Sequence, residues 1–249
     1  MHLAPLLLLP PSEGKAIGGK LGKGRGIFSK HLQSQRAEVI KALSGAVAHL
    51  ERDRLSNLLG VRGPLLDRAL SATLELDKPE AAYLPAWQRY TGVVWSNLNP
   101  VTLDEGMRER ILVPSALYGL NTSRDPIADY RLKMSVSLPE LGKLSSFWRP
   151  RLTSVLFEKY AGSMIVDLLP EEHAAAFNFV ELEEFCDLVR VRFLTANGKA
   201  AAGHGAKAAK GQLARTILHG GLDATEDFRF EGWRVRRSAK ELLVLAPRT

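Results

Sequence analysis

The sequence predicts a single compact domain of mixed α/β (α+β) class, built on a central mixed sheet with a helical excursion. Three apolar runs of strand length, 6–9, 111–117 and 163–169, are typical of strands buried on both faces of a sheet. Residues 187–194 alternate apolar with polar side chains, as in a strand with one wet face. Because 45% of the 249 residues are hydrophobic and no linker rich in proline or serine divides them, we expect one domain over residues 1–249.

The helical excursion follows the first strand. Apolar residues recur at helical spacing over 34–59 and again from Leu65. Gly60 suits the left-handed cap of the first helix, and Pro64 suits the first turn of the second. The segment 43–75 therefore has the outline of a helix-hairpin-helix element.

Arg62 and Gly63 lie at the tip of this hairpin. In helix-hairpin-helix units, the backbone N–H groups of the glycine-rich turn bind a phosphate, which gives DNA binding without sequence preference. An ordinary packed pair of helices would explain the same pattern. The charge of Arg62 favours the phosphate-binding interpretation.

The elements expected after residue 100 are predicted from shorter sequence patterns. Thr102 and Glu105 form the pattern of a capping box that opens a helix to Arg110. A helix is predicted over 206–219, because Gly220-Gly221 follows its last apolar residues. Near the carboxyl end, the sequence predicts short strands at about 228–230, 233–235 and 242–245.

The polar segment after the first strand is the most informative one for function. Pro10-Pro11 ends the apolar run, and Ser12-Glu13-Gly14-Lys15 then supplies a hydroxyl, a carboxylate and an ammonium group. Residues 14–26 are rich in glycine and basic residues. Glycine lets the backbone approach an anion closely, and the cations neutralise it. We therefore predict a phosphate-handling edge here, with a basic linker as the alternative for 18–26.

The same segment nearly matches a nucleotide-binding phosphate loop. Gly14, Gly19 and Lys20 have the spacing of the Gly-x-x-x-x-Gly-Lys-Ser/Thr motif, but Leu21 stands where the magnesium-binding hydroxyl belongs. Glycines at 22, 24 and 26 also interrupt the helix that should follow. The loop is expected to contact phosphate without forming an ATPase site.

Charge is distributed unevenly along the chain. The formal net charge is +7, divided into +6 over 13–62, −5 over 63–185 and +6 over 186–249. If the two basic ends meet in the fold, they form a face that suits nucleic acid or a phosphorylated ligand. A solvated basic surface without a partner is the alternative.

The single cysteine, Cys186, excludes an internal disulfide and favours a reducing compartment. The apolar run at the start is too short for a signal peptide or a membrane span, so we expect a cytoplasmic protein that does not bind membranes. The six histidines show no paired spacing of metal ligands. We predict neither a metal site nor a cofactor.

Taken together, several segments make the sequence resemble the YaaA family of bacterial peroxide-stress proteins, in its actinobacterial form. They occur in family order over nearly the whole chain: Pro10–Lys15, Arg89–Val93, Ser115–Leu120, Asp125–Ile127, Tyr130–Leu132, Trp148–Pro150, Val166–Leu168, Lys207, Lys210-Gly211 and Leu213–Arg215. Two stretches depart from the family pattern, namely Asn121–Arg124 and Gly203–Ala206.

The resemblance implies a cytoplasmic protein that binds DNA and limits oxidative damage under peroxide. It also implies a compact α/β fold with a helix-hairpin-helix element and a positively charged cleft. Lowered free iron is associated with the family. The histidine and cysteine pattern gives no support for direct iron ligation, so an effect on iron would be indirect.

Two functions of different class fit the sequence. In the first, the chain is a monomer that binds double-stranded or structured DNA. Its phosphate-binding candidates are Ser12, Lys15, Lys20, Arg62, Gly63, Arg131, Lys207, Lys210 and Arg215, and Tyr90 and Tyr118 could stack on exposed bases. Lys15 and Lys207 are further expected to share one anion site.

In the second, the chain is an enzyme that acts on a nucleobase or nucleotide in a glycosylase-like manner. The candidate catalytic residues are Glu13, Asp125, Asp167 and Glu172, because a carboxylate could stabilise an oxocarbenium-like sugar or activate water. Structural ion pairs would explain the same carboxylates. Carboxylates that converge in a hollow would favour the enzyme, whereas a flat basic groove would favour the binder.

Overall fold

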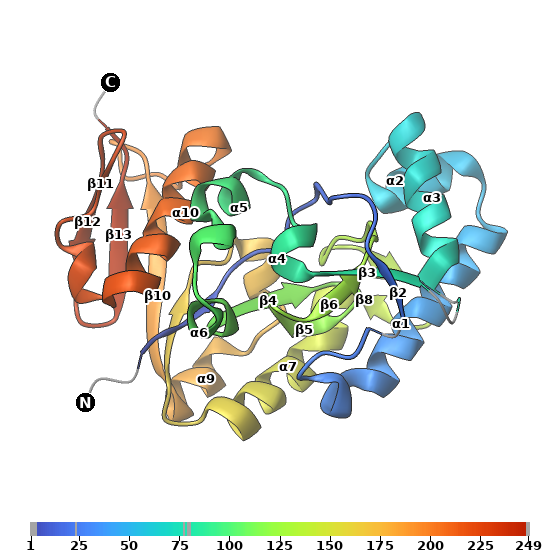
Figure 1. Ribbon diagram of the computed structural model, residues 1–249, viewed down its shortest axis with the longest axis horizontal. Coiled ribbons are helices and arrows are strands. Elements are labelled where there is room, and N and C mark those ends of the chain that lie inside the picture. Colours follow the sequence, from blue (N-terminus) through green and yellow to red (C-terminus); the bar gives the residue numbers. More distant parts are fainter. Residues whose placement is uncertain (1–3, 23, 77, 79–80, 248–249) are drawn as a thin grey trace.

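A computed structural model describes residues 4–22, 24–76, 78 and 81–247. Its centre is a mixed sheet of eight strands (Figure 1). In spatial order the strands are β11 (Arg229–Phe230), β12 (Trp233–Arg237), β13 (Glu241–Leu245), β10 (Asp187–Leu194), β9 (Met164–Asp167), β1 (Leu6–Leu8), β4 (Ile111–Ser115) and β5 (Gly119–Thr122). The five strands from β13 to β4 are parallel, and β5, β12 and β11 are antiparallel to their neighbours.

The apolar runs of the sequence form the middle of this sheet. All three residues of β1 are buried, and β1 pairs with β4 on one side and with β9 on the other. The chain passes from β1 to β4 and later returns to β9 across β1. The carboxyl end of β1 is therefore the switch point of the topology, where open α/β sheets form their ligand sites.

Helices cover the two sides of the sheet. In Figure 1, α7 (Leu144–Tyr160) and α9 (Phe179–Phe185) lie on one side, and α5 (Val93–Leu98) and α10 (Gly203–Gly220) lie on the other. α5 and α10 pack closely, because Gly211 of α10 has no side chain to hold them apart. Short helices fill the connections: α4 (Ala86–Arg89), α6 (Glu105–Glu109), α8 (Glu171–Ala174), η1 (Pro100–Thr102) and η2 (Asp223–Thr225).

The helical excursion consists of α1 (Ser29–His49), α2 (Arg52–Leu59) and α3 (Pro64–Leu76), which lie together at one end of the molecule (Figure 1). A three-stranded sheet of β2 (Lys20–Gly22), β3 (Ala81–Pro85) and β6 (Pro126–Ala128) lies beside them. A small hairpin of β7 (Ser137–Leu138) and β8 (Gly142–Lys143) precedes α7. Among the described residues, no helix is long and apolar enough to cross a membrane.

The helix expected over 34–59 is two helices. α1 begins earlier, at Ser29, and ends at His49, since Leu50 and Glu51 adopt extended backbone angles. α2 then starts with Asp53 in its first turn, where a carboxylate interacts favourably with the helix dipole. The predicted cap at Gly60 is confirmed, with φ of 65°, and α3 begins at Pro64 as expected.

The predicted capping box at Thr102 is wrong. Thr102 ends a 3₁₀ turn and donates its hydroxyl hydrogen to Asn99 O, so its oxygen does not cap a helix. Asp104 is the N-cap instead, and its carboxylate accepts the Met107 N–H at 2.7 Å. An aspartate is at least as good a cap as threonine, and here it lies directly before the helix.

Candidate functional site

Three loops that follow parallel strands lie around the switch point of the sheet. The first follows β1 and contains Ser12, Glu13 and Lys15. The others contain Ser115, at the end of β4, and Asp167, at the end of β9. Because these strands are parallel, their carboxyl ends share one edge of the sheet. The phosphate-handling segment predicted from the sequence therefore lies where ligands bind in this class of sheet.

Lys15 occupies the middle of this edge. Its ammonium group donates to Ser12 O at 2.9 Å and lies 4.1 Å from the centre of the Tyr130 ring and 5.7 Å from that of Tyr90. The backbone of Lys15 pairs with Tyr90 in an isolated β-bridge. Burial lowers the pKa of Lys15 to about 7, with Asp129 and Glu13 opposing that effect. Much of this amine is thus neutral at physiological pH.

A chain of buried hydroxyl groups lies behind Lys15. Tyr130 Oη is 2.8 Å from Ser115 Oγ and 3.1 Å from Tyr90 Oη, and Ser115 Oγ accepts the Tyr118 N–H. Tyr118 Oη in turn accepts the Ala128 N–H. Burial raises the pKa of Tyr90, Tyr118 and Tyr130, so all three phenols stay protonated.

These contacts correct the expectation that Tyr90 and Tyr118 stack on exposed bases. Their relative exposures are 3% and 7%, and their rings pack against Trp95 and Tyr130 respectively. An aromatic residue type alone does not distinguish a stacking platform from a core side chain. Here both rings are buried by their neighbours in the core. The face of the Tyr90 ring lies next to the Lys15 ammonium group.

Ion pairs surround Lys15 on both sides. Arg131 and Lys133 bind the carboxylate of Glu13 at 2.7 Å and 3.3 Å. Partial burial opposes the ionisation of Glu13, but these two cations lower its pKa. On the other side, Arg68 of α3 binds Asp129 at 2.8 Å and donates to Lys15 O at 2.7 Å. The predicted phosphate ligand Arg131 is therefore already paired with a carboxylate.

Two small hollows open on either side of Lys15. One, of about 80 Å³, has walls from α3 and from the segment around Tyr130, and includes Arg68 and Asp129. The other, of about 50 Å³, includes Glu172 and His173. Lys15, Glu13, Tyr130 and Arg131 line both hollows. The two hollows are therefore parts of one cleft, with Lys15 between them.

The far wall of this cleft comes from α8, in the segment after β9. Glu172 accepts the N–H and the hydroxyl hydrogen of Ser135 at 3.2 Å and 2.8 Å. Burial lowers the pKa of His173 to about 4, so this imidazole is neutral at physiological pH, and its Nδ1 is buried with no hydrogen-bond partner among the described residues. Lys210 donates to Leu168 O at 2.6 Å, and burial lowers its pKa to about 8.

The four candidate catalytic carboxylates do not all meet. Glu13 and Glu172 line the same hollow, whereas Asp167 is not among its lining residues and is bound by Arg190 at 3.1 Å and by the Leu169 N–H. Burial raises the pKa of Asp167. Asp125 is separate, because it shares a hollow with Leu6 at the opposite end of β1.

Asp125 has a structural role at that opposite end. Its carboxylate accepts the Ile27 N–H at 3.2 Å and both the N–H and the hydroxyl hydrogen of Thr122. These three donors use most of its acceptor capacity, which closes the turn after β5. The structure therefore does not bring Asp125 and Glu13 together in one catalytic site.

The remaining basic candidates are dispersed. Lys20 is exposed on β2, and Lys207 is exposed on α10, one turn before Lys210. Arg215 is half-buried and binds Leu98 O, Asn99 O and Thr102 Oγ1. Arg215 thus ties α10 to the end of α5. No contact joins Lys15 to Lys207 among the described residues, so their shared site stays a prediction.

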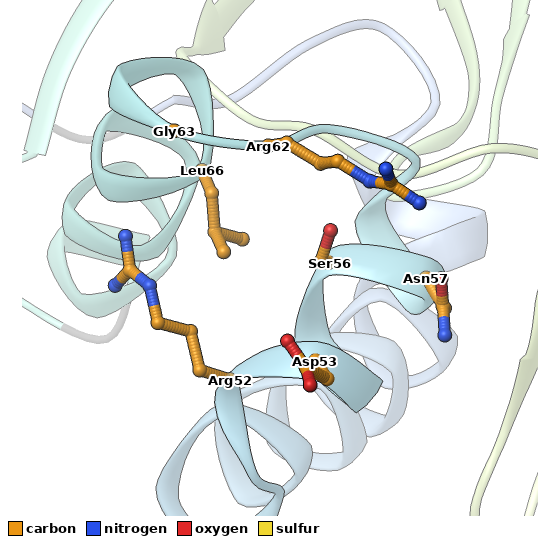
Figure 2. Close-up of a pocket in the computed structure, with 7 residues that line it drawn as sticks. All are labelled: Arg52, Asp53, Ser56, Asn57, Arg62, Gly63 and Leu66. Carbon is orange, nitrogen blue, oxygen red and sulfur yellow. The ribbon is translucent and has the colours of Figure 1, made fainter.

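The hairpin between α2 and α3 borders a second, wider hollow of about 500 Å³ (Figure 2). Leu66 points into it, and Arg62 extends its guanidinium group along the α2 side. Arg52, on the other side, is paired with Asp67 at 2.6 Å. Gly63 has φ of 54°, and the position that a Cβ would take there is open.

Sequence reasoning missed several residues of the cleft, namely Arg68, Ser115, Lys133 and His173, as site residues. Ser115 ends an apolar strand, which is a signal that could have been used. Arg68 lies in the middle of a helix, and nothing in its neighbours indicates that it reaches Lys15. Within the described chain, no cluster of His, Cys, Asp and Glu side chains could hold a metal ion.

Comparison with known proteins identifies the family of this chain. Residues 6–239 match the family model described as peroxide stress protein YaaA. A UPF0246 protein from Streptomyces coelicolor is 31% identical over 246 residues, covering 94% of this chain and 93% of that protein. UPF0246 proteins from Bacteroides thetaiotaomicron (30%; 82% of each chain) and Corynebacterium glutamicum (29%; 85% of this chain and 84% of that one) are also similar. The chain therefore belongs to the peroxide stress protein YaaA family.

Proposed function

We propose that this protein binds DNA without sequence preference and so limits oxidative damage during peroxide stress. Membership of the peroxide stress family supports the physiological setting. The observation that carries the DNA proposal is the hairpin at residues 60–63. We further propose that the protein acts as a monomer in the cytoplasm, which suits its one free, buried cysteine, Cys186.

The hairpin presents unpaired donors to solvent. Within the described part of the chain, the backbone N–H groups of Arg62, Gly63 and Leu65 have no acceptor. They lie at the start of a 13-residue helix, where the dipole favours an anion. The exposed guanidinium group of Arg62 is adjacent. A backbone phosphate would satisfy these donors without any contact with a base.

Changing Gly63 to asparagine is expected to weaken DNA binding about tenfold or more while the fold remains. The added side chain would block the close approach of a phosphate to the hairpin amides. Losing one amide hydrogen bond to a charged group costs about 1.5–3 kcal/mol, and 1.4 kcal/mol corresponds to a tenfold change in affinity. Asparagine tolerates positive φ, whereas valine at Gly63 would be strained. Fluorescence anisotropy with a labelled duplex measures the affinity, and circular dichroism measures the melting temperature.

Gly198→Asn is the matched control. Gly198 also has positive φ (75°) and open space at its Cβ position, but it lies in the turn after β10. Arg62→Ala should reduce the salt slope by about one phosphate contact. If Gly63→Asn and Gly198→Asn affect DNA binding equally, or if neither Gly63→Asn nor Arg62→Ala affects it, the hairpin does not bind DNA.

A second candidate function is an enzyme acting on a nucleobase or nucleotide. It is favoured by one observation, that Glu13 and Glu172 line the same hollow. Each carboxylate is already engaged, Glu13 by two cations and Glu172 by Ser135. Incubation with DNA containing oxidised bases, followed by chromatography for released base, tests this activity. Release that survives Glu13→Gln and Glu172→Gln would argue against these carboxylates.

A further inference from the structure

Lys15 is placed as a reactive amine rather than as a structural cation. Within the described residues, no carboxylate lies within ion-pair distance of its ammonium group, although Glu13 and Asp129 line the same cleft. Among the described residues its ammonium group makes one hydrogen bond, to Ser12 O, and it lies over the faces of two aromatic rings. Burial and neighbouring cations are the conditions under which lysines act as nucleophiles.

The neighbouring cations make the same cleft attractive to an anionic ligand. Arg68, Arg131 and Lys133 flank Lys15, and the first two disfavour a positive charge on it. Lys15 itself lines both hollows of the cleft, so its amine faces space that a ligand can enter. A substrate that combines an electrophilic carbon with a phosphate would use both features.

The hairpin leads directly into this cleft. α3 starts one residue after Gly63, and its Leu65, Arg68 and Ala69 form one wall of the hollow beside Lys15. Five residues of helix, from Gly63 to Arg68, span about 7.5 Å. That is the rise of about two nucleotides of one strand. Arg68 lies in this wall and donates to Lys15 O, so DNA held by the hairpin would place a neighbouring sugar beside this wall of the cleft.

We propose that the Lys15 amine forms a Schiff base with the open-chain aldehyde of an abasic deoxyribose in DNA. The proposal rests on the proposed DNA binding. The neutral Nζ attacks the aldehyde carbon, a C–N bond forms as the C=O π bond breaks, and the proton that the nitrogen loses goes to the oxygen to give a carbinolamine. The hydroxyl group then leaves as water with a proton from solvent, which gives a protonated imine. No oxidant or reductant is required for this step.

Other lysines of the cleft are less suited to this reaction. Lys133 is paired with Glu13 at 3.3 Å, and Lys210 lines neither hollow. Lys133 lines one of the two hollows and Lys15 lines both, so the position of the adduct distinguishes these two amines.

The test is reductive trapping with borohydride. Wild-type protein and a duplex containing one abasic site are expected to give a covalent adduct, and mass spectrometry of its peptides should place the sugar on Lys15. The yield should rise about tenfold between about pH 6 and pH 8 and then level off, because the pKa of Lys15 is about 7. A lysine with its ordinary pKa of about 10.4 would give a yield still rising at higher pH.

Lys15→Arg keeps the charge but lacks the nucleophile, so trapping should fall at least about tenfold. Lys199→Arg, at an exposed lysine in the segment after β10, should trap as wild type. Adducts spread over exposed lysines, or trapping unchanged in Lys15→Arg, would overturn the proposal. Peptide mapping of the wild type remains decisive if Lys15→Arg fails to fold.

The failure of this proposal can be told apart from the failure of DNA binding. Anisotropy with an undamaged duplex reports binding alone, and free 2-deoxyribose 5-phosphate reports the amine alone. DNA binding without an adduct at Lys15 overturns the Schiff base and leaves DNA binding standing. An adduct of the free sugar phosphate at Lys15, without binding of either duplex, supports the amine chemistry and overturns DNA as its substrate.

Discussion

Replacing Arg89 with methionine is expected to destabilise the protein by about 3 kcal/mol or more, seen as a melting temperature about 6–12 °C lower. Arg89 is 1% exposed, and its guanidinium group donates to four backbone carbonyls: Ile127 O, Ala16 O, Gly18 O and Ala82 O. Without it these carbonyls lose the hydrogen bonds from the guanidinium group. An unsatisfied buried acceptor costs about 1–3 kcal/mol, and relaxation recovers part of the sum.

The same variant should also affect the cleft. Arg89 holds the chain directly after Lys15 against β3 and β6, so its loss frees the segment that positions the amine. Arg89→Lys is the control, because one ammonium group cannot reach four carbonyls and should recover only part of the stability. Differential scanning calorimetry measures both variants. A decrease below about 2 °C in Arg89→Met would contradict this account.

Gly211→Ala is expected to lower stability by about 2 kcal/mol, which corresponds to about 4–8 °C. A Cβ at this position would lie 2.3 Å from Val94 O and 2.9 Å from Leu98 N. Both are backbone atoms of α5, so α5 and α10 would have to move apart. Because Lys210 precedes Gly211, this shift should also weaken the hydrogen bond from Lys210 to Leu168 O.

Gly205→Ala is the matched control on the same helix. Its Cβ would meet only Trp233, at 3.8 Å, which is ordinary van der Waals contact. Alanine is favoured over glycine inside a helix by about 0.5–1 kcal/mol, so this variant should melt at the same temperature or slightly higher. Equal destabilisation by the two substitutions would show that the close approach of α5 and α10 does not matter.

The central strands could be predicted from the sequence because their signal is local. β1, β4, β9 and β10 are apolar or alternating runs that need no knowledge of their partners. The strands near 81–85, 119–122 and 126–128 gave no such signal. Their positions depend on distant side chains, such as Arg89 and Asp125, that satisfy their backbone or close their turns.

The candidate site was predictable in part for the same reason. Pro10-Pro11 marks the end of β1, and this located Ser12, Glu13 and Lys15. The sequence could not show that Arg68 and Tyr130 meet Lys15, since they lie 53 and 115 residues further along the chain. It also could not show which polar groups are already paired. The ion pair of Glu13 with Arg131 is visible only in the structure. The same holds for the hydrogen bonds of Asp125 that close the turn after β5.

The most direct test of the account is the salt dependence of DNA binding, measured by anisotropy on two duplexes of unrelated sequence. The account predicts equal affinity for both, and a log–log slope of about −3 or steeper between about 50 mM and 200 mM salt, becoming shallower by about one in Arg62→Ala. A flat salt dependence, no binding at the lowest salt, or a strong preference for one duplex would contradict DNA binding through backbone phosphates.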